Sequence, residues 1–113
     1  MKTIWSKVAD DILSIGQPLN EVGIDNWALT KAQALEVLER LEEAEISILG
    51  GDIYENIDGI IQSNYDNWYC EQLPEESKSA FLSRSITKAR EYIEDYQRAP
   101  STMVYFVLVP SVD

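Results

Sequence analysis

Closely spaced carboxylates are the residues of this sequence that could do chemistry. Asp52, Glu55 and Asp58 are each three positions apart. Two carboxylates at a suitable separation can act as general acid and base in a glycoside hydrolase, and carboxylate oxygens can hold a hard cation. The ligand spacing and the closing acid of an EF-hand loop are missing, however, and the three residues fall on an expected β-hairpin. We therefore expect neither a metal site nor catalytic residues here.

The 113-residue sequence has no histidine and one cysteine, Cys70. The first absence removes the usual general base, the Ser-His and Cys-His pairs and the commonest metal ligand. The paired glycines Gly50 and Gly51 fit a bend in a strand better than a phosphate-binding loop. A lone cysteine cannot form an internal disulfide and is compatible with a reducing compartment. The sequence thus predicts a protein that is not an enzyme and needs no cofactor.

Charge is the outlying property of the composition. Twenty Asp and Glu against nine Lys and Arg give a net charge of -11. A binder of nucleic acid needs clustered cations, so we expect no direct nucleic acid contact and instead a basic partner. Solubility alone is the plainer explanation of such acidity. Asp10 and Asp11 interrupt any signal peptide, and no apolar run approaches the roughly twenty residues of a membrane span, so we expect a cytoplasmic protein without membrane contact.

The acids are unevenly distributed along the chain. Half of them lie between Leu41 and Ser77, a stretch without Lys or Arg. This asymmetry favours a binding surface of one charge sign, which Asp52, Asp58 and Asp66 would share. Exposed aromatic residues beside carboxylates are good contacts for a protein partner, although core packing is the alternative for each of them. The predicted partner-binding residues are Asp52, Tyr54, Glu55, Asp58, Tyr65, Asp66, Trp68, Tyr69 and Glu71.

The elements that position these residues begin with two expected helices. Ile4, Val8, Ile12 and Ile15 recur at helical spacing and predict a helix over residues 4–15. Residues 22–29 fit a short edge strand or an extended lead-in. A capping box at residues 30–33 then predicts a second helix that runs to about residue 44.

The acidic stretch itself reads as strands and turns. Residues 46–54 predict a strand with a glycine bulge or bend, and Asp58-Gly59 predicts the turn of a hairpin whose return strand covers residues 60–63. Residues 64–67 are expected to form a second polar turn, followed by another strand over 68–71. Because neighbouring residues of a strand point to opposite faces, one of Trp68 and Tyr69 should be buried and the other exposed.

The last third predicts a long helix and a buried strand. Pro74, Glu75 and Glu76 suit a first helical turn, so the helix should run from residue 74 to about 97. Residues 103–109 are apolar without alternation, which predicts a central strand covered on both faces. Together the elements predict one α+β domain over residues 1–113, with a single layer of four to five mostly antiparallel strands packed against helices.

Several segments resemble a bacterial immunity protein family, immunity protein 40 of polymorphic toxin systems. They are residues 26–30 (NWALT), 50–54 (GGDIY), 65–69 (YDNWY), the helix through 83–85, 89 and 92–93, and 105–106. The similarity spans residues 22–109.

The resemblance implies a non-catalytic antidote in the cytoplasm, made alongside a secreted or contact-delivered toxin. It would bind and block the C-terminal domain of that toxin. Many toxins of such systems are basic nucleases, and the acidic composition fits a basic nuclease as the target. The alternative is a small regulatory or ligand-binding module, whose acidic and aromatic residues would line a pocket.

Overall fold

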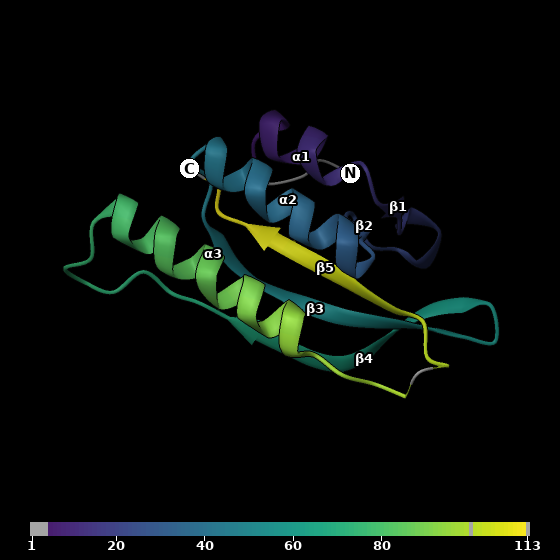
Figure 1. The fold of residues 1–113 in the computed structure, drawn as a ribbon. Coiled ribbons are helices and arrows are strands. Elements are labelled where there is room, and N and C mark those ends of the chain that lie inside the picture. Colours follow the sequence, from purple (N-terminus) through teal and green to yellow (C-terminus); the bar gives the residue numbers. More distant parts are fainter. Residues whose placement is uncertain (1–4, 100, 113) are drawn as a thin grey trace.

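The computed structural model describes residues 5–99 and 101–112, which form three helices and two antiparallel sheets (Figure 1). The elements are α1 (Lys7–Leu13), β1 (Gln17–Pro18), the 3-10 helix η1 (Asn20–Val22), β2 (Trp27–Ala28), α2 (Lys31–Glu43), β3 (Ile48–Ile57), β4 (Ile60–Tyr69), α3 (Lys78–Asp95) and β5 (Val104–Pro110). The α+β class and the antiparallel pairing are confirmed. The five strands are divided between two sheets, one of two strands and one of three.

The larger sheet has the order β4-β3-β5, so β3 is its central strand. The prediction that residues 103–109 form the centre was therefore wrong. Both faces of β5 are nevertheless covered, because Phe106 and Leu108 join the core under the helices while Val107 packs with Leu19 and Ala28. The unbroken apolar run of residues 103–109 indicates that both faces of the strand are buried. This can be true of an edge strand as well as of a central one.

The smaller sheet pairs β1 with β2 and covers part of the face of β5 that points away from α2 and α3. Leu29, just after β2, bridges to β5. Its N–H donates to the Phe106 carbonyl at 2.9 Å, and the Phe106 N–H donates to the Leu29 carbonyl at 2.7 Å. The short edge strand expected within residues 22–29 is thus present, preceded by η1.

Helix α1 is shorter than expected and turns a different face to the core. Ser6 caps it by accepting from the Ala9 N–H at 3.2 Å. Its buried residues are Ala9 and Leu13, whereas Val8 is 55% exposed, so the expected apolar stripe was wrong at this position. Ile4 lies outside the described residues.

Helix α2 begins at the predicted capping box. The Gln33 N–H donates to Thr30 Oγ1 at 3.2 Å, and the Thr30 N–H donates to Gln33 Oε1 at 3.0 Å. Helices α2 and α3 pack side by side on one face of the larger sheet, and α1 packs on α2 (Figure 1). Leu38 and Ile86 from the two helices meet Ile53 of β3 in one buried cluster.

Helix α3 begins later than expected. Its cap is Ser77, whose hydroxyl accepts from the Ala80 N–H at 3.1 Å. The expected start at Pro74 was wrong because the Glu76 carboxylate accepts from the Leu73 N–H at 3.0 Å and from Arg84, which holds residues 74–76 in a turn before the helix.

The β3–β4 hairpin confirms both local predictions for its first strand. The pairing of β3 with β5 shifts register between Ile48 and Gly50, at the predicted bulge. Asp58 and Gly59 form the turn with φ of 52° and 86°, and the Gly59 N–H donates to Asn56 Oδ1 at 2.9 Å. Left-handed backbone at both central residues gives a two-residue turn the twist that a hairpin needs.

Candidate partner-binding surface

A bulge in β4 replaces the predicted second turn. Asp52 pairs with Asn67 and Tyr54 pairs with Ser63, so three residues of β4 lie opposite Ile53. Tyr65, the middle one of these three residues, has a left-handed backbone with a φ of 70°. Because local side chains satisfy the bulged backbone, the chain continues in the same direction. Residues 68 and 69 are accordingly the end of β4, and the expectation of a polar turn over 64–67 and a separate strand over 68–71 was wrong.

Side chains of the bulge fix the position of Tyr65. The Tyr65 N–H donates to Ser63 Oγ at 3.0 Å, and Asn67 Nδ2 donates to the Tyr65 carbonyl at 3.1 Å. The Asp66 N–H donates to Asn64 Oδ1 at 2.9 Å. With its backbone held in this way, Tyr65 extends into solvent and is 86% exposed.

A polar network joins the inner side of the bulge to the end of α3. Asn64 Nδ2 donates to Glu55 Oε2 at 2.7 Å and to the Tyr96 hydroxyl at 2.8 Å. Tyr96 donates in turn to Asp66 Oδ2 at 2.6 Å, and Arg98 Nε lies 2.6 Å from Glu55 Oε2. Glu55 is buried, so we correct its expected place on an exposed surface and assign its carboxylate to this network.

The network shifts two pKa values in opposite directions. The hydrogen bond from Asn64, aided by Arg98, lowers the pKa of Glu55 against the opposing effect of burial. Burial, followed by the hydrogen bond to Asp66, raises the pKa of Tyr96 to about 12. Both shifts keep the groups in the states that the hydrogen bonds require, an ionised Glu55 and a neutral Tyr96.

Trp68 and Tyr69 behave as the alternation of a strand predicts. Trp68 is buried and stacks on Tyr92 of α3 with ring centroids 4.6 Å apart. Tyr69 is 69% exposed, and Lys88 of α3 both lies over its ring and donates to its carbonyl at 2.7 Å. Trp68 is therefore a core residue and is not available to a partner, contrary to its expected role.

The remaining predicted residues do not share one surface. Asp52 and Tyr54 lie on the face of β3 opposite Ile53, where Tyr54 packs against the cluster of Leu19 and Val107. Burial raises the pKa of Asp52, and burial together with the Asp52 charge raises that of Tyr54. Asp58 lies at the hairpin turn.

Asp66 accepts from the Tyr96 hydroxyl beside the end of α3, whereas Asp52 lies on the other face of the sheet and Asp58 at the turn. The expected common face of Asp52, Asp58 and Asp66 is therefore not formed. The side chains that do lie along one edge are Tyr65, Asp66, Tyr69 and Glu71, which we call the β4 edge. These four are all exposed.

Three arginines, two in α3 and one after it, neutralise some of the acids of residues 41–77. Arg84 contacts Glu76 at 2.7 Å, Arg98 contacts Glu55, and Arg90 lies 3.9 Å from Glu42. Arg84 also donates to the Cys70 sulfur at 3.3 Å and to the Glu71 carbonyl, and so holds the segment after β4 against α3. Residues 41–77 contain no Lys or Arg, but the fold places arginines from elsewhere in the chain beside their acids. The surface that they form therefore does not carry negative charge alone.

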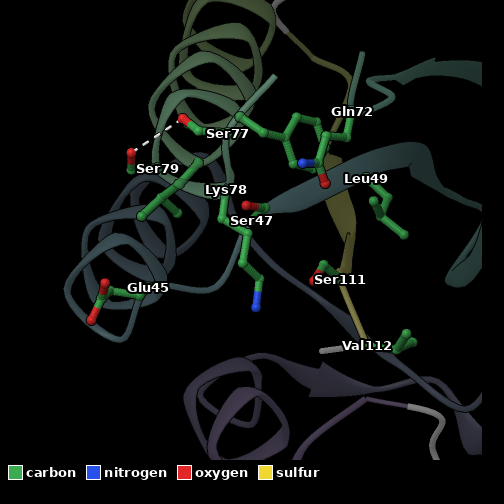
Figure 2. A pocket seen from close by; sticks show the side chains of 11 residues that line it. Glu45, Ser47, Leu49, Gln72, Ser77, Lys78, Ser79, Ser111 and Val112 are labelled. Carbon is green, nitrogen blue, oxygen red and sulfur yellow. Dashed lines mark hydrogen bonds between the residues drawn. The ribbon is translucent and has the colours of Figure 1, made fainter. Parts of the chain in front are cut away.

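A hollow of about 670 Å³ lies where α3 and β3 begin and β5 ends (Figure 2). We call it the terminal hollow. Its lining residues are Glu45, Ser47, Leu49, Gln72, Ser77, Lys78, Ser79, Phe81, Leu82, Ser111 and Val112. The predicted aromatic residues do not line it, so it is not the acidic aromatic pocket of the alternative interpretation.

In residues 5–99 and 101–112, no group of His, Cys, Asp or Glu is placed to hold a metal ion. Within the same residues, none of the helices has the length and hydropathy needed to cross a membrane. Asp52 and Glu55, which are three positions apart in the sequence, lie on opposite faces of β3.

Fold and site together define a small α+β protein with a bulged edge strand that exposes aromatic and acidic side chains. The family model described as immunity protein 40 matches residues 18–110, and the chain belongs to this family. No curated protein and no solved structure matches the chain. Membership fits a toxin-neutralising role, and immunity proteins are generally non-catalytic.

Proposed function

We propose that this protein is a cytoplasmic immunity protein that binds the C-terminal domain of a cognate bacterial toxin, secreted or delivered by contact, and neutralises it without catalysis. The observation that carries the proposal is the family match over residues 18–110, which extends from β1 to the end of β5. The matched segment contains the bulge, the polar network and most of the lining of the terminal hollow, whose Ser111 and Val112 follow its last residue.

The β4 edge is the proposed contact surface. Tyrosines contribute large contact areas at a low cost in side-chain entropy, and such residues dominate the binding energy of many interfaces. The bulge fixes the backbone of Tyr65 before binding, so less freedom is lost in the complex. The backbone of this edge is partly occupied, because the Tyr65 and Tyr69 carbonyls already accept hydrogen bonds. Recognition through side chains is therefore better supported than addition of a partner strand.

The charge of the protein suggests the chemistry of the toxin. A net charge of -11 would speed the encounter with a basic protein and slow that with an acidic one. Many nucleases present a basic cleft to phosphate backbones, which an acidic inhibitor can cover. We therefore propose a basic toxin domain, with a nuclease as the favoured activity.

Coexpression tests the function. Cells that express the C-terminal toxin domain encoded beside this gene should grow when they also express this protein, and should die without it. A double variant, Tyr65→Ala with Tyr69→Ala, should lose protection. The control is Met103→Ala, which should keep it, because Met103 is 56% exposed and directly precedes β5, on the opposite side of β3 from β4. Failure of the wild-type protein to protect would reject the proposed function.

A further inference from the structure

The terminal hollow combines an apolar floor with a polar rim. Phe81 is buried and Leu82 is half-buried, while Leu49 and Val112 are 37% and 53% exposed. Figure 2 shows Leu49 and Val112 on one side of the hollow and Glu45 on the other. Exposed aliphatic side chains around a hollow of this size are a common feature of interaction sites.

The hollow is continuous with the β4 edge. Tyr69 pairs with Gly50, and the N–H of the next residue, Cys70, donates to the Leu49 carbonyl at 2.8 Å. Gln72 then lines the hollow itself. A partner that contacts Tyr65 and Tyr69 would therefore meet the hollow as the next feature along the surface.

Acids border the hollow on two sides. Glu45 lines it after the end of α2, and Glu71 and Glu75 are exposed on the segment between β4 and α3. Arg84, a cation of the first half of α3, is already occupied by Glu76 and by the Glu71 carbonyl. Lys78, at the start of α3, also lines the hollow and has a partner within the chain, so Glu45, Glu71 and Glu75 outnumber the one lining cation. The net negative charge around the apolar floor favours positive charge on whatever binds there.

We infer that the terminal hollow receives an apolar side chain of the toxin, flanked by lysine or arginine residues that contact Glu45, Glu71 and Glu75. This inference rests on the proposed function and extends its contact surface. The volume leaves room for a large aliphatic or aromatic side chain together with part of its own backbone, as expected for the buried centre of an interface.

A second copy of this chain fits the hollow less well than a toxin does. Two molecules of charge -11 repel each other, and a symmetric contact at the hollow would bring the same acids together. A basic protein would be attracted by the same acids that repel a second copy of the chain.

The test measures the affinity of the purified toxin domain encoded beside this gene, made catalytically inactive, for four variants. Val112→Glu places a charge at one side of the hollow, and its control is Ile60→Glu, at a position of similar exposure (56%) near the hairpin turn. Glu45→Lys reverses a charge at the rim, and its control is Glu21→Lys, on η1. We expect each hollow variant to raise the Kd about tenfold or more, and each control to change it by less than about threefold.

The outcomes separate the two proposals. If the wild-type protein does not bind the toxin domain, the proposed function fails. If wild type binds and both hollow variants bind equally well, the function stands and the inference about the hollow is wrong. Circular dichroism establishes that each variant is folded; Glu45→Lys changes an exposed residue and so keeps the test open if Val112→Glu unfolds the chain. Loss of a dimer in Val112→Glu, seen by light scattering with unchanged toxin binding, would also contradict the inference.

Discussion

Tyr65 is a non-glycine residue in the left-handed region, where an L-amino acid has an unfavourable contact between Cβ and backbone worth about 1–2 kcal/mol. Glycine has no Cβ and avoids this contact. We therefore predict that Tyr65→Gly will have a free energy of unfolding about 1 kcal/mol higher than that of Tyr65→Ala. Urea denaturation measures both values, and the comparison removes the effect of losing the ring, which the two variants share.

The same pair of variants also tests the role of the ring. Both should bind the toxin domain more weakly than wild type, whatever their stabilities. If Tyr65→Ala proved as stable as Tyr65→Gly, the left-handed conformation of the bulge would be contradicted. If both kept wild-type affinity, Tyr65 would not be a contact of the β4 edge.

Glu76 makes stability depend on pH through its contact with Arg84. The hydrogen bonds from Arg84 and from the Leu73 N–H lower its pKa from 4.5 to about 2. A carboxylate with a lowered folded-state pKa adds stability above its unfolded value, and this stability is lost as the pH falls from about 4.5 toward about 2. We predict that Glu76→Gln will lose less free energy of unfolding than wild type over this interval.

Urea denaturation at a series of pH values checks this prediction. Glu75→Gln is the matched control, because Glu75 is the exposed neighbour of Glu76, and its profile should follow that of wild type. Glu55, whose pKa is also lowered, adds a dependence of the same sign in all three proteins. Parallel profiles for wild type and Glu76→Gln would contradict the role given to Arg84.

At the scale of elements, α3 and the sheet are joined by packing that leaves no space at Gly51. A Cβ at this position would lie 2.4 Å from the Trp68 ring and 2.9 Å from the Val107 carbonyl. The ring cannot move without disturbing Tyr92, on which it stacks. We predict that Gly51→Ala will lower the free energy of unfolding by about 1–3 kcal/mol and will change the near-ultraviolet circular dichroism of the aromatic stack.

Gly59→Ala is the control for this substitution. Gly59 has a φ of 86° but open space around its Cβ position, so alanine there should cost about 1 kcal/mol through the backbone alone. Its aromatic circular dichroism should match wild type. An unchanged aromatic spectrum in Gly51→Ala would show that the position of the Trp68 ring does not require a residue without a Cβ at position 51.

Elements specified by local chemistry could be predicted from the sequence. The capping box at Thr30, the turn at Asp58-Gly59 and the bulge near Gly50 each depend on residues close in the chain. The start of α3 could not be predicted, because Arg84 decides it from the second turn of the helix by holding Glu76. The order of the strands is likewise set by tertiary packing, since coverage of both faces does not reveal how many neighbours a strand has.

At the scale of the molecule, the predicted site was drawn from one stretch of sequence, whereas the fold distributes that stretch over two faces and a turn. Tyr65, Asp66 and Tyr69 remain together because they belong to a single edge strand, and Glu71 follows two residues after its end. The terminal hollow could not be found in this way. Its lining comes from the end of α2, the start of β3, the start of α3 and the end of β5, and these segments meet only in the folded chain.

Charge could act on toxin binding through the whole molecule or through the hollow, and a pair of charge-reversed variants separates the two. One variant reverses Glu45, Glu71 and Glu75 to lysine around the hollow. The other reverses Glu21, Glu39 and Glu94, exposed residues of η1, α2 and α3 that lie outside its lining. Both change the net charge of -11 by the same amount, so a long-range field would slow association in both to a similar degree.

We predict that the reversal around the hollow will slow association more and will also speed dissociation, because contacts made in the complex are lost as well as the long-range attraction. The distant reversal should mainly slow association, and its deficit should shrink as salt screens the field over about 10 Å at 0.1 M. Surface plasmon resonance from low to high salt gives both rate constants. Equal dissociation rates for the two variants would assign the acids to steering alone and would place the contact surface elsewhere than the hollow.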